Sequence, residues 1–88
     1  MRRIRTKNLE PAAKLACISA LRGRGLSAED AASLWDAHSS EALTAAELAF
    51  HARAAGLDLG APGAVIELME SWRADVESWA LERLRNTP

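Results

Sequence analysis

Cysteine is almost absent from this 88-residue chain, and long apolar runs are missing altogether. Because Cys17 is the only cysteine, no disulfide framework is expected, and a reducing compartment is the natural setting. No apolar run approaches the roughly 18 residues that a membrane-spanning helix needs. The basic start "MRRIRTK" resembles the first part of a signal peptide, but Lys14 and Arg22 interrupt the apolar stretch that follows. These features predict a cytoplasmic protein with no membrane association.

The sequence also lacks a catalytic or metal-binding motif. His38 and His51 are the only histidines, and zinc sites require three or four ligands at characteristic spacings. The stretch "RGRG" lacks the preceding strand and the Gly-Lys-Ser/Thr ending of a phosphate-binding loop. We therefore predict no enzymatic activity, no metal and no cofactor. A hydrolase that pairs Cys17 with a histidine is the alternative that these residues leave open.

Large apolar side chains are few. Apolar residues make up 49% of the chain, but nineteen of them are alanine, which leaves 23 valine, isoleucine, leucine, methionine, phenylalanine and tryptophan residues. A core built from so few large side chains is small and must pack closely through alanine contacts. Small domains of this kind often gain stability by oligomerising, so a homodimer is expected.

The charges are distributed unevenly along the chain. Residues 1–25 hold seven basic groups against one acidic group, whereas residues 26–88 hold four arginines against eleven acidic groups. This pattern predicts a basic arm on an acidic body. The arm suits contacts with phosphates, which makes a nucleic-acid-binding accessory protein one alternative. The acidic body suits a second one, an inhibitor that occupies a basic groove on another protein. The basic residues of the arm are Arg2, Arg3, Arg5 and Lys7.

Capping signals divide the chain into helices. Ser27 with Asp30 forms a capping box, and Thr44 with Glu47 forms a second one. Gly23 stops the first helix, and a left-handed Gly56 is expected to stop the third. Strand-like alternation is absent. The prediction is a single all-α domain, a small four-helix bundle with short connections and a long C-terminal helix. The helices are expected at about residues 9–22, 28–38, 45–55 and 62–85, with residues 1–7 as a flexible arm.

The hydrophobic pattern predicts which side chains are buried. In the last helix, apolar residues recur at spacings of 4, 3, 4 and 3, which is the seam of a heptad. That seam consists of Val65, Met69, Trp72, Val76 and Trp79. The core is predicted to include Leu9, Ala13, Ala16, Leu21, Leu34, Trp35, Leu48, Val65, Met69, Trp72 and Val76.

The triplet Glu-Ser-Trp occurs twice in the last helix and places Trp72 and Trp79 on one face. One interpretation is that both indoles are core. The other is that the last helix is longer than the helices that cover it, so that its outer end stays partly uncovered for a partner. On that basis we expect a non-enzymatic protein-interaction or regulatory module that self-associates. The small size, the absent chemistry and the uneven charge suit an accessory or inhibitor protein of a phage, a mobile element or a bacterium. The expected interface residues are Trp79, Leu81, Arg83, Leu84 and Glu77.

Overall fold

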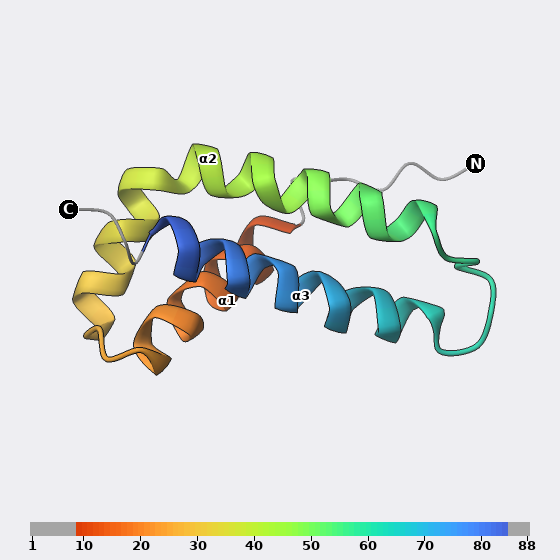
Figure 1. Ribbon diagram of the computed structural model, residues 1–88, viewed down its shortest axis with the longest axis horizontal. Helices are drawn as coiled ribbons and strands as arrows, with labels where there is room; N and C mark the ends of the chain where they lie inside the picture. The colour runs from red at the N-terminus through yellow and green to blue at the C-terminus, as the bar shows by residue number, and fades with distance from the viewer. Residues whose placement is uncertain (1–8, 85–88) are drawn as a thin grey trace.

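The computed structural model describes residues 9–84, which form three helices packed against one another (Figure 1). Helix α1 spans Glu10–Gly23, α2 spans Ala28–Ala55 and α3 spans Ala64–Arg83. No strand occurs within these described residues, so the predicted all-helical class is confirmed. The predicted number of four helices is wrong. Residues 1–7, expected to form an arm, lie outside the described part of the chain.

The structure has three helices instead of four because the two helices predicted at 28–38 and 45–55 are the two halves of α2. His38, where the first of these helices was predicted to end, has non-helical angles (φ −122°, ψ 17°), but the chain is helical again from the next residue and α2 is kinked there. Residues 39–43 include neither glycine nor proline, and nothing there stops the helix from continuing. Thr44 does not cap a new helix, because its hydroxyl donates a hydrogen bond of 3.0 Å to the carbonyl oxygen of Ser40 inside α2.

The remaining helix ends follow local chemistry. The predicted cap at Ser27 is confirmed, since its hydroxyl oxygen accepts a 3.1 Å hydrogen bond from the backbone N–H of Asp30. The left-handed conformation expected at Gly56 is wrong, because its φ is −89°. Gly63 adopts that conformation instead (φ 80°) and precedes α3, which begins two residues later than predicted.

The kink in α2 determines what covers the end of α3. In Figure 1 the first half of α2, in yellow, lies at the same end of the molecule as the blue C-terminal turn of α3. Trp35 from this half of α2 and Leu84 after α3 belong to one buried cluster, with 3% and 1% of their surface exposed. The outer end of the last helix was expected to be uncovered, and for Leu84 this prediction is wrong.

Trp72 lies at the centre of the core. Its indole N–H donates a 2.8 Å hydrogen bond to the carbonyl oxygen of Ala46, and its ring and that of Phe50 form a T-shaped pair at a centroid distance of 6.1 Å. This bond joins α3 to α2 and satisfies the polar atom of a side chain that is 1% exposed. Seven of the predicted core residues are buried, and Leu34 packs against them half-buried. The seven are Leu9, Ala13, Ala16, Leu21, Trp35, Trp72 and Val76.

Three predicted core residues lie on the surface instead: Leu48 is 68% exposed, Val65 56% and Met69 37%. The buried residues of α3 recur every fourth position, and each step of four turns the buried face by about 40° around the helix. The buried face of α3 therefore winds around the helix, which a straight heptad seam does not describe. Its members are Ala64, Leu68, Trp72, Val76 and Ala80.

An ion pair between Arg53 and Asp75 bridges α2 and α3 at the surface. Two guanidinium nitrogens of Arg53 donate hydrogen bonds of 2.8 Å to the two carboxylate oxygens of Asp75. These hydrogen bonds are the main cause that lowers the pKa of Asp75 below its ordinary value of 3.8. The bidentate ion pair joins the last turn of α2 to the middle of α3.

Acid should weaken this bridge selectively. A lowered pKa in the folded state means that the contribution to stability is complete above the ordinary pKa and disappears as pH falls through the folded-state value. We expect Asp75→Asn to melt at a slightly lower temperature than the parent at pH 7, with the gap closing as pH falls through the lowered pKa of Asp75. Thermal melts followed by circular dichroism at neutral and acidic pH measure this, and Arg53→Gln should behave alike. An equal gap at neutral and acidic pH would contradict the assignment.

Candidate interaction surface

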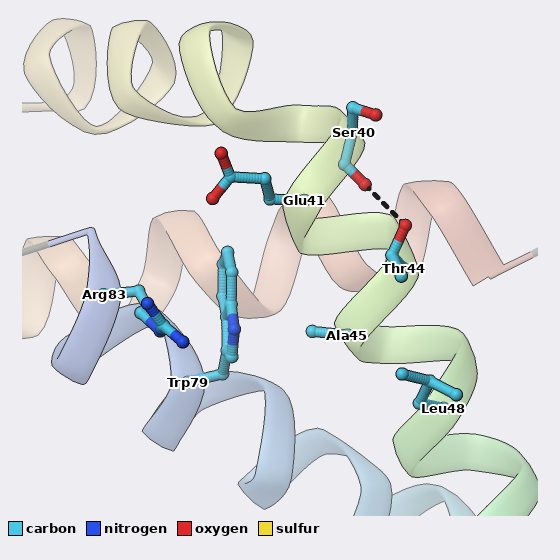
Figure 2. A pocket seen from close by; sticks show the side chains of 7 residues that line it. All are labelled: Ser40, Glu41, Thr44, Ala45, Leu48, Trp79 and Arg83. Carbon is cyan, nitrogen blue, oxygen red and sulfur yellow. Dashed lines mark hydrogen bonds between the residues drawn. The ribbon is translucent and has the colours of Figure 1, made fainter.

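A groove opens between the second half of α2 and the C-terminal half of α3. Figure 2 shows the indole of Trp79 rising from α3 toward α2, with Arg83 at one side and Ala45 across from it; α1 lies behind both helices. The groove has a volume of about 360 Å³. Its lining combines an aromatic ring, aliphatic side chains, hydroxyl groups and two opposite charges. The lining residues are Ser40, Glu41, Thr44, Ala45, Leu48, Trp79 and Arg83.

A smaller apolar pocket of about 130 Å³ adjoins the groove on the other side of Trp79. It exists because alanine side chains of α2 face α3 here and are too short to fill the space between the helices. It compares in size with the cavity of about 150 Å³ that holds a benzene molecule in an engineered protein. One aliphatic or aromatic side chain therefore fits it. The pocket is lined by Ala42, Ala45, Ala46, Ala49, Asp75, Val76 and Trp79. We call the groove and this pocket together the Trp79 groove.

Charged residues mark the two ends of the Trp79 groove. Because α2 and α3 run in opposite directions (Figure 1), Glu41 on α2 and Arg83 on α3 lie at the same end of the groove, where both line it. The Arg53–Asp75 ion pair lies at the other end. The negative charge is therefore on α2 at one end and on α3 at the other. The apolar residues lie between these two pairs of opposite charges.

The expected interface residues lie in different environments in the structure. Trp79 is half-buried, packs against the core and lines the groove, together with exposed Arg83. Glu77 and Leu81 are half-buried on α3 and do not line it, and the carboxylate of Glu77 lies 4.0 Å from Arg73. Leu84 is buried in the core, as described above. The residues of the basic arm, Arg2, Arg3, Arg5 and Lys7, lie outside the described residues.

The half of the groove that belongs to α2 was not predicted. Glu41 was assigned to the connection between two helices, and Leu48 was assigned to the core. Both errors come from the interruption that was expected between residues 38 and 45. In a continuous helix, residues 41, 45 and 48 share one face at spacings of four and three, which is the signal that places them together.

A second set of exposed apolar side chains lies on α1 and α3, away from the Trp79 groove. Leu15 is 68% exposed, Ile66 66%, and Leu15 and Met69 line a shallow hollow of about 280 Å³ between the two helices. Glu70 and Arg73, both on α3, also line this hollow, whereas the charges that line the Trp79 groove come from two different helices. Leu15 and Leu48 have the same exposed fraction, which makes them a matched pair for experiments on the two faces.

The described residues give no support to a catalytic or metal site. Cys17 is fully buried, and this burial raises the pKa of its thiol to about 11. The thiolate needed for nucleophilic attack is therefore disfavoured. His51 is exposed on α2, and His38 is half-buried at the kink. Within residues 9–84, no group of three metal-ligating side chains comes together. In the same range, no helix combines the length and the apolar character required to cross a membrane.

Comparisons of this chain with protein-family models, curated proteins and solved structures found no match. The Trp79 groove itself is therefore the basis for assigning a function. It is the one place among the described residues where a half-exposed tryptophan, an apolar pocket and bracketing charges occur together.

Proposed function

We propose that the protein is a non-enzymatic interaction module that binds an amphipathic α-helix of a protein partner in the Trp79 groove. The observation that carries this proposal is the half-exposed indole of Trp79 beside an apolar pocket that the chain itself leaves unfilled. A tryptophan in this position offers a large apolar area and loses little conformational entropy when it becomes buried, which is why tryptophan is frequent at binding hot spots.

The shape of the groove favours a helix as its occupant. Two helices packed side by side leave a furrow along their length, and a third helix can fill it with apolar residues at every third or fourth position. Here the furrow reaches from Glu41 to Arg53 on α2, about 18 Å at the rise of an α-helix. A partner helix of about three turns matches this length.

The charge of the helical body bears on the kind of partner. The described residues include twelve acidic and six basic side chains, and this excess of negative charge disfavours phosphate binding by the body. The same excess suits an accessory or inhibitory role, in which a phage or bacterial protein binds a basic surface of another protein in the cytoplasm. The basic arm remains the basis of the alternative in which the protein binds nucleic acid.

Photo-crosslinking in the producing cell tests the proposed function. A photoreactive amino acid in place of Leu48 should form a covalent adduct, and mass spectrometry should place the other end of the crosslink in a helical segment. A second substitution, Trp79→Ala or Ala45→Arg, should remove this adduct, because the first deletes the indole and the second fills the groove. The photoreactive residue in place of Leu15, equally exposed on the other face, is the control. An absent adduct, or one unchanged by both groove variants, would overturn the proposal.

A further inference from the structure

A partner that covers the Trp79 groove has to match the charges at its two ends. Glu41 and Arg83 form one end, Arg53 and Asp75 the other, and the sign on each helix reverses from end to end. A surface with this arrangement is complementary to a copy of itself. When one copy is turned by 180° about an axis that runs along the groove, its α2 faces α3 of the first copy, and each acidic residue meets a basic residue.

From this self-complementarity we infer that the occupant is a second copy of the chain, and that α2 and α3 of both copies form an antiparallel four-helix bundle. The inference rests on the proposed function, because it names the partner of the same groove. Glu41 of each copy pairs with Arg83 of the other. Going around that end of the bundle, the four charges alternate in sign. The Arg53–Asp75 pairs alternate in the same way at the other end.

The apolar residues match as well. Leu48 projects from α2 with 68% of its surface exposed and lines the groove together with Trp79. In the two-fold arrangement, Leu48 of one copy meets the pocket that Ala45, Ala49 and Trp79 form in the other. A leucine side chain suits that pocket in size and polarity. A large residue then opposes small ones in both halves of the interface, as in the packing of four-helix bundles.

The size of the face is sufficient for a weak dimer. The second half of α2, residues 39–55, is about 25 Å long, and two helices side by side are about 20 Å wide. The two copies together therefore bury on the order of 1,000 Å², close to the lower limit of specific interfaces. We expect a dimer whose population depends strongly on protein concentration.

Charge reversal tests the arrangement. Glu41→Arg and Arg83→Glu should each weaken self-association by at least about tenfold, since each replaces two attractive contacts between copies by repulsive ones. An equimolar mixture of the two variants should dimerise like the parent, because the reversed charges then face each other. Glu70→Arg, the same charge change at an exposed position on the other side of α3, should dimerise normally. Sedimentation velocity over a wide concentration range gives the dissociation constants, and circular dichroism verifies folding.

A second pair of variants does not depend on charge contacts within the chain. Leu48→Lys should be monomeric and Leu15→Lys dimeric, although both side chains are 68% exposed and neither supports the core of one copy. A monomeric parent, a dimeric Leu48→Lys, or a mixture of charge variants that stays monomeric would each overturn the inference. If the parent is monomeric but the crosslink from position 48 joins another protein, the proposed function stands and only the second copy is wrong. If the parent is monomeric and no crosslink forms from position 48, the proposed function and the inference of a second copy are both wrong.

Discussion

Trp72→Ala should unfold the protein at moderate temperature. The side chain is 1% exposed, and its removal deletes the contact with Phe50 and the hydrogen bond to Ala46. Substitutions of a buried aromatic residue by alanine cost about 3–5 kcal/mol. A chain of 88 residues has a total stability of only about 4–13 kcal/mol. With about 4–8 °C of melting temperature per kcal/mol for a domain of this size, the expected loss is at least about 12 °C.

Two further variants separate the causes of that loss. Trp72→Phe keeps an aromatic ring in the core but leaves the Ala46 carbonyl without the indole donor, and we expect about 1–3 kcal/mol of destabilisation. Trp79→Ala removes a half-exposed ring and should cost less than Trp72→Ala. Chemical denaturation followed by circular dichroism gives the three free energies of unfolding. If Trp79→Ala destabilised the chain as much as Trp72→Ala, the assignment of Trp79 to the surface groove would be wrong.

Helix boundaries were predictable from the sequence wherever a side chain or a glycine decides them locally. Ser27 caps α2 because its hydroxyl reaches the N–H of Asp30, a contact between residues three apart that the sequence alone reveals. The stop predicted at Gly23 falls two residues early, because Gly23 is the last residue of α1 and the left-handed glycine that follows the helix is Gly25 (φ 105°). The continuity of α2 was not predictable in this way. Thr44 and Glu47 have the residue types of a capping box, but with no helix breaker before them the preceding turn stays helical and Thr44 bonds Ser40 instead.

The candidate site was predictable on one helix only. Trp79 and Arg83 follow from their position on the last helix, because a four-residue spacing places them together whatever they face. The opposing surface depends on which residues of α2 meet them, and this depends on α2 passing through the kink at His38 as one helix. Leu84 is likewise buried in a cluster that includes Trp35 from the first half of α2, which the last helix by itself does not indicate. Nothing within the last helix contains this information.

Alanine is the second reason why the core was predicted only in part. Large apolar side chains were assigned to the core first, yet Val65 and Met69 are exposed, whereas Ala80 is fully buried and Ala64 is 6% exposed. Where two helices cross closely, a methyl group fills the available space and a larger side chain does not fit. The hydrophobicity of a residue says how much it gains from burial, but the distance between the helix axes decides which residue is buried.

Ala80→Leu should therefore destabilise the protein although it adds apolar surface. Ala80 has no exposed surface and lies on the face of α3 that turns toward the other two helices, so a leucine there must push the helices apart. Overpacking of this kind costs about 1–3 kcal/mol, which lowers the melting temperature by at least about 4 °C. The same substitution at Ala74, which is exposed on α3, should change the free energy of unfolding by no more than about 0.5 kcal/mol.

Comparing the two leucine variants separates the effect of packing on stability from the effect of helix propensity. Alanine and leucine are both good helix formers, and the two sites lie on one helix. Thermal and chemical unfolding of the two variants and the parent provide the measurement. Equal stability of Ala80→Leu and Ala74→Leu would mean that α3 does not approach its neighbours as closely as described. A loss of stability in Ala80→Leu but not in Ala74→Leu would establish that the nineteen alanines include residues that set the distance between helices. Through that distance they also set the width of the Trp79 groove, whose floor consists of alanines of α2.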